Sequence, residues 1–60
     1  MMYSYEWFGY GMEITNEETG RSCFLQGEEA SELYDQLESA RTDRAVQRIL
    51  SEYSVLMEED

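Results

Sequence analysis

Three acidic residues are spaced so that one face of a helix would carry all of them. Glu28, Glu32 and Asp35 follow one another at intervals of four and three residues. At a rise of about 1.5 Å per residue, they would stand about 6 and 4.5 Å apart along the helix axis. The phosphates of a nucleic-acid strand are spaced similarly, so such a stripe could imitate a strand and occupy a basic groove. A solvated helix face has the same pattern and is the simpler interpretation.

Arginines form a second group with possible chemistry. Arg41, Arg44 and Arg48 are three of the four basic residues, and they gather where a second helix is predicted to start. Such a cluster can bind a phosphate or a carboxylate through paired hydrogen bonds. Because acids are in large excess, we favour the alternative that these arginines neutralise acids of the neighbouring helix. Arg48 and Glu52 are also one helical turn apart, a spacing that stabilises a helix modestly.

The side chains needed for nucleophilic or metal chemistry are scarce. Cys23 is the only cysteine, and the chain has no histidine. A catalytic thiol needs a base or cation that lowers its pKa, and zinc is bound mainly by cysteine and histidine. Catalysis by paired carboxylates needs a cleft, for which a short chain leaves little room. We therefore expect a half-buried apolar role for Cys23, no metal, no cofactor and no enzymatic activity.

Charge restricts the kinds of partner. The 60 residues include 14 acidic residues, four arginines and no lysine, which gives a net charge of −10. Nucleic acids and anionic membranes repel such a chain, whereas basic protein surfaces attract it. No basic stretch followed by an apolar core begins the sequence, and no apolar run approaches the roughly 20 residues of a membrane span. We expect a cytoplasmic protein that contacts neither nucleic acid nor membrane directly.

The elements that position these residues begin with a β-hairpin over about 4–26. In its turn, Asn16 can accept a hydrogen bond from the backbone two residues later, and Gly20 can adopt a left-handed conformation. A loop over 17–20 then sets Asn16 opposite Arg21. This register predicts an apolar face for helices to cover: Ile14 opposite Cys23, Met12 opposite Leu25, and Phe8 and Tyr10 further along.

The opposite face of this hairpin would be aromatic. It would carry Tyr3, Tyr5, Trp7, Gly9, Gly11 and Glu13, with Phe24 and Gln26 across from the last two. An aromatic ring often covers the gap that a strand glycine leaves, so Phe24 or Trp7 could simply rest on Gly9 and Gly11. The alternative is an exposed surface that binds another molecule. Under that alternative, the predicted interface consists of Tyr5, Trp7 and Phe24.

Two helices are predicted after the hairpin, over about 28–40 and 43–58. The first begins after Gly27 as N-cap and carries Ala30, Leu33, Tyr34 and Leu37 at helical spacing. Thr42 caps the second, whose apolar stripe comprises Val46, Ile49, Leu50, Tyr53 and Met57, with Leu56 alongside. The short connection makes the helices antiparallel neighbours. The predicted fold is a single α+β domain over 1–60, ββαα in order.

Small size and surplus aromatics together suggest a binding role. A 60-residue domain buries only about 60% of the surface of its unfolded chain, so we expect support from a homodimer or another partner. In size and charge the chain resembles small acidic accessory proteins of phages and plasmids, several of which inhibit host enzymes. We expect a protein-binding module that occupies a basic surface of a larger partner, as an inhibitor or nucleic-acid mimic. The alternative is an assembly protein whose aromatic face serves only self-association.

Overall fold

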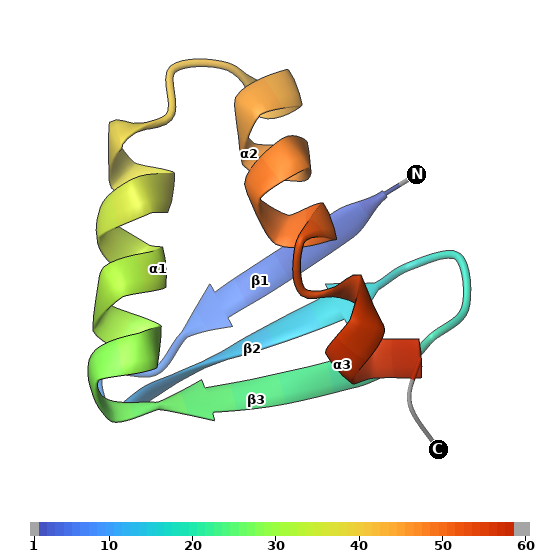
Figure 1. Ribbon diagram of the computed structural model, residues 1–60, viewed down its shortest axis with the longest axis horizontal. Helices are drawn as coiled ribbons and strands as arrows, with labels where there is room; N and C mark the ends of the chain where they lie inside the picture. The colour runs from blue at the N-terminus through green and yellow to red at the C-terminus, as the bar shows by residue number, and fades with distance from the viewer. Residues whose placement is uncertain (1, 59–60) are drawn as a thin grey trace.

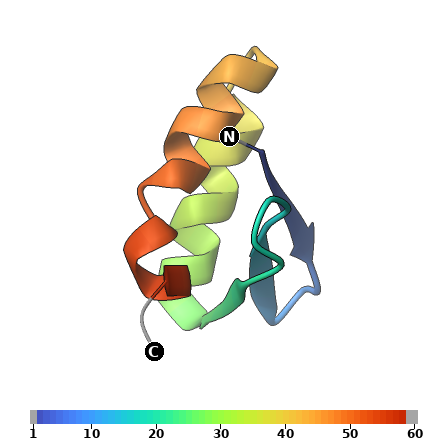
Figure 2. The same ribbon diagram turned by 90° about the vertical axis from the view of Figure 1, so that its right-hand side faces the viewer.

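The chain forms a three-stranded antiparallel sheet with helices on one of its faces (Figures 1 and 2). The structure is a computed structural model that describes residues 2–58. The strands pair in the order β1-β2-β3. In sequence order the elements are β1 (Tyr3–Trp7), β2 (Gly11–Asn16), β3 (Ser22–Gln26), α1 (Gly27–Ser39), α2 (Asp43–Ser51) and α3 (Ser54–Glu58). The α+β class is confirmed, but the order is βββααα where ββαα was predicted.

The β2–β3 hairpin has the predicted turn and register. The Asn16 side chain accepts a hydrogen bond of 2.9 Å from the Glu18 N–H, and Gly20 has a φ of +80°. The Asn16 N–H donates to the Arg21 carbonyl at 2.8 Å, which fixes the pairing of the two strands. Along the ladder, Ile14 pairs with Cys23, Met12 with Leu25, Glu13 with Phe24 and Gly11 with Gln26, all as predicted.

The stretch before β2 is not one long strand, and this corrects the prediction. The chain reverses at Gly9 and Tyr10, and Phe8 N–H donates to the Gly11 carbonyl at 2.8 Å. Gly9 has a φ of +89°, the conformation that the first central residue of a type II′ turn requires. A glycine–any-residue pair between two strands is a known signal for this turn. β1 thus folds back as a third strand.

This turn reverses which face of β1 points inward. Trp7 pairs with Met12 and Tyr5 with Ile14, so odd-numbered residues of β1 share a face with even-numbered residues of β2. An uninterrupted strand would have kept these two sets on opposite faces. The prediction that Tyr3 and Trp7 point outward is therefore wrong, as is the prediction that Phe8 lies in the core. Tyr3 is buried and Phe8 is exposed.

The core lies between the sheet and the helices. Its buried side chains are Tyr3, Met12, Ile14 and Leu25 from the sheet, Ala30, Leu33 and Leu37 from α1, Leu50 from α2 and Met57 from α3. The three residues of α1 occupy the predicted apolar stripe. Half-buried side chains at the margin of the core are Trp7, Cys23, Tyr34, Val46, Ile49 and Tyr53.

The ends of the helices differ in part from the prediction. Gln26 rather than Gly27 is the N-cap of α1, whereas Thr42 caps α2 as predicted and accepts a 3.1 Å hydrogen bond from the Ala45 N–H. The second predicted helix breaks after Ser51. There the Glu52 and Tyr53 N–H groups bond three residues back, which tightens the last turn. The break lets α3 turn and contact β2 and β3 (Figure 1).

Candidate functional site

Two of the three predicted interface residues do not point outward. Trp7 is half-buried on the helix-covered face, and its ring stacks on that of Tyr34 in α1 with centroids 4.5 Å apart and planes 24° apart. Tyr5 lies on the same face, opposite the buried Ile14, with 38% of its surface exposed. Phe24 alone projects from the opposite, uncovered face. The predicted surface of Tyr5, Trp7 and Phe24 is thus divided between the two faces of the sheet.

A different aromatic group is exposed. Phe8, Tyr10 and Phe24 keep 41%, 69% and 43% of their surfaces accessible. Their ring centroids form a triangle with sides of 6.0 to 6.1 Å, within the range of favourable aromatic pairs. We call these three residues the aromatic patch. It joins the β1–β2 turn to the outer face of β3, and sequence reasoning missed two of its members because it missed the turn.

One ring of the aromatic patch packs against the backbone of Gly11. A Cβ atom placed on Gly11 would lie 2.5 Å from Cζ of Phe24 and 2.7 Å from the carbonyl oxygen of Leu25. The Phe24 ring therefore rests on the backbone of Gly11, which confirms the predicted aromatic cover for a strand glycine. The ring has one face on the sheet and much of its surface in solvent. Phe24 therefore covers the strand glycine and also presents an exposed ring, and binding of another molecule through this ring stays a prediction.

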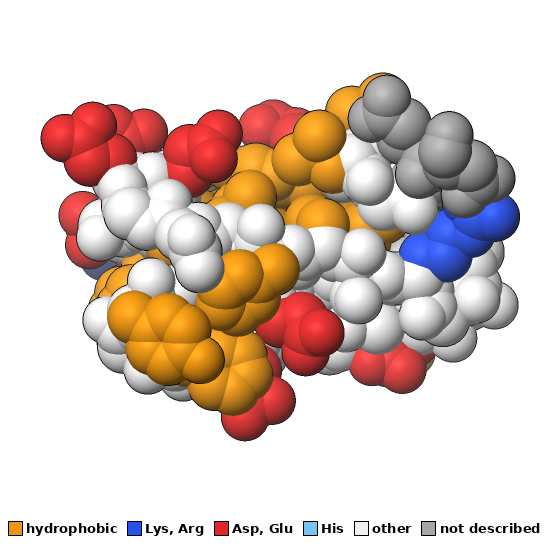
Figure 3. All heavy atoms as spheres, turned by 90° about the horizontal axis from the view of Figure 1, so that it is seen from below, with side chains coloured by type: hydrophobic (Ala, Val, Ile, Leu, Met, Phe, Trp, Pro, Cys, Tyr) orange, Lys and Arg blue, Asp and Glu red, His pale blue; other side chains and the backbone are white. Residues whose placement is uncertain are grey.

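Carboxylates border the aromatic patch on the outer face. Glu6 pairs directly with Glu13 across β1 and β2, and Glu13 pairs with Phe24 across β2 and β3. Glu6, Glu13 and Phe24 thus form one row across the sheet, in which the two carboxylates adjoin a member of the patch. Figure 3 shows hydrophobic side chains gathered at one end of the molecule with acidic side chains around them. Like charges directly opposite one another destabilise a sheet, so this row favours a positively charged neighbour.

The acidic stripe of the first helix is present. Glu28, Glu32 and Asp35 all lie on α1 and are exposed. Figure 2 shows α1 in the helical layer on one face of the sheet. The strand pairing places Phe24 on the opposite face, with the rings of Phe8 and Tyr10 beside it. The structure therefore presents the acidic stripe and the aromatic patch on opposite sides of the sheet, and Glu6 and Glu13 are the acids that lie on the side of the patch.

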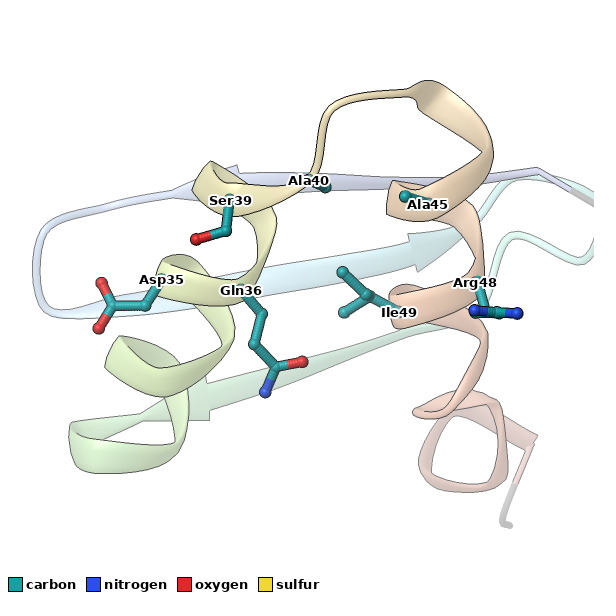
Figure 4. Close-up of a pocket in the computed structure, with 7 residues that line it drawn as sticks. All are labelled: Asp35, Gln36, Ser39, Ala40, Ala45, Arg48 and Ile49. Carbon is teal, nitrogen blue, oxygen red and sulfur yellow. The ribbon is translucent and has the colours of Figure 1, made fainter.

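The arginines do not form the predicted ion pairs. Among the side chains of residues 2–57, no carboxylate lies within 4.0 Å of Arg41, Arg44 or Arg48. Arg48 and Asp35 instead belong to the rim of a shallow groove of about 470 Å³ between α1 and α2 (Figure 4). Gln36 and Ile49 point into this groove, while Asp35 points away from α2. The groove brings together no pair of acids or bases suited to proton transfer.

Cys23 has the environment of a packing residue. It is half-buried and unpaired. Burial, and next the charge of Glu13, raise the pKa of its thiol above the ordinary value. A raised pKa keeps the thiol protonated and poorly nucleophilic at neutral pH. Among residues 2–58, no group of three or more histidine, cysteine or acidic side chains is arranged to hold a metal ion.

Comparison with known proteins leaves this surface to be interpreted from its own geometry. No protein-family model, curated protein or solved structure matches the chain. In the described part of the chain, the helices are too short or too polar to cross a membrane. The exposed aromatic patch with its acidic border is the candidate functional site.

Proposed function

We propose that this protein is a small acidic binding module that occupies a basic surface of a larger protein. The observation that carries the proposal is the aromatic patch of Phe8, Tyr10 and Phe24 beside the paired carboxylates of Glu6 and Glu13. Exposed aromatic clusters are typical of interaction sites, and aromatic rings supply much of the binding free energy at interfaces. The proposed role is binding rather than catalysis, in the cytoplasm and without a cofactor.

Electrostatics supports a basic partner. The net charge of −10 acts over the whole surface and speeds encounters with a positively charged protein. Close to the patch, a lysine or arginine of the partner would relieve the repulsion between Glu6 and Glu13. The rings would then supply the buried part of the contact, and the carboxylates its charged rim.

Inhibition by mimicry of nucleic acid is the sharper form of this proposal. The exposed stripe of Glu28, Glu32 and Asp35 would enter a basic groove that normally holds a nucleic-acid strand, and the protein would then act as an accessory inhibitor of the phage or plasmid type. This stripe lies in the layer opposite the aromatic patch. A mimic that used both faces would have to insert edgewise into its partner, with one wall of the groove on each side.

Self-association through the aromatic patch is the second candidate. The three exposed rings would be as well buried by a second copy as by another protein, and a homodimer would enlarge a small core. Sedimentation at several concentrations decides whether the purified protein associates. A monomer throughout the micromolar range, with a melting temperature independent of concentration, would refute the homodimer.

The test compares two variants as bait in a lysate of the cells that carry the gene. Phe8→Ala combined with Tyr10→Ala removes two rings of the patch, and Val55→Ala is the matched control, since Val55 on α3 is 68% exposed elsewhere on the surface. We expect a co-purifying protein with a basic surface that the double variant loses and the control retains. Equal retention by both variants, or a captured protein with an acidic surface, would refute the proposal. Loss of a homodimer in the double variant, with nothing else captured, would favour the assembly protein.

A further inference from the structure

We infer that the open edge of β1 binds an extended basic segment of the partner as a fourth strand, with a lysine or arginine opposite Glu6. This inference rests on the proposed function and adds to it the form and chemistry of the bound segment. Strand addition at a sheet edge is a common mode of peptide recognition, in which main-chain hydrogen bonds supply affinity and alternate side chains supply specificity.

The backbone of β1 offers hydrogen-bonding groups at this edge. The Phe8 N–H donates to the Gly11 carbonyl, and the Glu17 N–H donates to the Met2 carbonyl. The backbone N–H and carbonyl groups of even-numbered residues in this segment therefore point toward β2. The backbone N–H and carbonyl groups of odd-numbered residues point away from β2, toward the open edge of the sheet. Tyr3 has its N–H and carbonyl bound by the Gln47 amide at 2.7 and 2.9 Å.

The next two odd-numbered positions have no such cover. Within residues 2–58, the N–H and carbonyl groups of Tyr5 and Trp7 have no hydrogen-bond partner. They therefore offer two donors and two acceptors at positions two residues apart, which is the repeat that an antiparallel strand would match. Edge strands of this kind pair readily with another chain unless something blocks them. Here Gln47 blocks only the first position.

The helical layer extends past the sheet at this edge. The C-terminal end of α1, the N-terminal end of α2 and their connection project beyond β1 in both views (Figures 1 and 2). A fourth strand beside β1 would therefore lie beneath helices that are already in place. The side chain of Tyr5 is also incompletely covered at this edge, because 38% of its surface is exposed although it lies on the helix-covered face.

Charge selects a basic segment for this edge. Glu6 points to the outer face, where Glu13 is its direct neighbour on β2. A strand added along the open edge of β1 would place one of its side chains next to Glu6, on the side away from Glu13. A lysine or arginine there gives Glu6 one neighbour of opposite charge, which offsets the repulsion from Glu13. The arginines of this chain lie outside the sheet, at Arg21, Arg41, Arg44 and Arg48.

The same charge disfavours a second copy at this edge. Symmetric pairing that uses both free positions would bond Tyr5 of one copy to Trp7 of the other. The twofold axis would then pass midway between the Glu6 residues of the two copies and set their carboxylates opposite each other. Each copy would also bring a net charge of −10. A basic segment from another protein avoids both penalties.

The experiment is a titration of the ¹⁵N-labelled protein with a blocked five-residue peptide, Thr-Val-Arg-Val-Thr, followed by NMR. The valines would face Tyr5 and Trp7, and the arginine would face Glu6. We expect the largest amide shifts at these three residues, saturating at millimolar concentration. A peptide with glutamate in place of arginine should bind about fivefold more weakly, the scale of a cross-strand charge pair. A peptide with both valines N-methylated lacks the donors and should not bind.

Protein variants separate backbone pairing from side-chain contact. Tyr5→Pro removes an N–H that faces the edge and leaves the β2 ladder intact, while Tyr5→Val removes the ring but keeps the N–H. We expect the first to abolish peptide binding and the second to retain it. Glu6→Gln should make the arginine and glutamate peptides bind about equally. If Tyr5→Pro does not fold, the N-methylated peptide tests the same hydrogen bonds in the unaltered protein.

Four results would overturn the inference. They are equal binding of the N-methylated peptide, shifts confined to the aromatic patch, no shift with the arginine peptide up to about 10 mM, and a homodimer joined through β1. If edge binding fails while the patch variant still releases a basic partner, the proposed function stands without this inference. If edge binding succeeds and the patch variant releases nothing, the proposed function fails.

Discussion

Replacing Gly11 by alanine tests the packing on which the aromatic patch depends. The new Cβ atom would lie 2.5 Å from Cζ of Phe24 and 2.7 Å from the carbonyl oxygen of Leu25. The Phe24 ring is exposed on its far side and can swing away. The Leu25 carbonyl belongs to the neighbouring strand and can move only if β2 and β3 separate locally. The substitution therefore both displaces a ring and strains a ladder.

The expected loss of stability in Gly11→Ala is the difference between two opposing effects. Overpacking of a close contact costs about 1–3 kcal/mol. Alanine also restricts the unfolded chain, which returns about 0.4–1 kcal/mol. We expect a net loss of about 1–2 kcal/mol in the free energy of unfolding of the Gly11→Ala variant. For a domain of this size, that loss lowers the melting temperature by roughly 5–15 °C.

The matched variant is Gly9→Ala, two residues earlier. A Cβ atom at Gly9 would meet nothing within 4 Å, but its φ of +89° is unfavourable for alanine. Both variants should lose stability, by different causes. Thermal unfolding followed by circular dichroism measures the loss, and contacts between Phe8 and Phe24 ring protons show whether the patch persists. Only Gly11→Ala should disrupt those contacts. A Gly11→Ala protein with unchanged stability and unchanged ring contacts would refute the reasoning.

Three further predictions concern stability. Trp7→Ala should lower the free energy of unfolding by about 3 kcal/mol, because it removes a half-buried ring stacked on Tyr34. Phe8→Ala should lower it by less than about 1 kcal/mol, because Phe8 is exposed. Denaturant unfolding that ranks the two losses in the reverse order would contradict the register of β1. Sodium chloride should raise the melting temperature, because it screens the repulsion of a net charge of −10, and a steady fall up to about 0.5 M would contradict this. Burial raises the thiol pKa of Cys23 and the hydroxyl pKa of Tyr53, so the folded state retains these protons longer and its stability should fall as the pH rises beyond about 9. Urea unfolding at several alkaline pH values should show a smaller loss of stability with rising pH in Cys23→Ala than in the unaltered protein. An equal loss in both proteins would show that the Cys23 thiol does not cause it.

The sequence by itself determined the features that depend on neighbouring residues. Asn16 and Gly20 specify the β2–β3 turn through their own conformations, and the turn then fixes the register of both strands. The cap of α2 at Thr42 is equally local. The buried side of α1 follows from its 3.6-residue period. Each of these signals lies within a few residues of the feature it controls.

Tertiary structure decided which side of β1 is buried. Large apolar residues occupy odd positions from Tyr3 to Trp7 and even positions from Phe8 to Ile14, so the alternation changes phase at Trp7, but a bulge in one long strand and a turn at Gly9 both produce such a change. A two-residue turn shifts the alternation by one, because Trp7 then pairs with Met12. The shift moves Trp7 onto the helices and leaves Phe8 and Tyr10 in solvent. It thereby creates the candidate site.

The division between α2 and α3 also depended on packing. No glycine or proline marks the break after Ser51, and the apolar stripe runs on to Met57. A straight helix would have carried Met57 away along the axis of α2. The break instead returns α3 to β2 and β3, where Met57 is buried. The gain in buried apolar surface at a distant part of the chain outweighs local helix propensity, and a local pattern cannot report it.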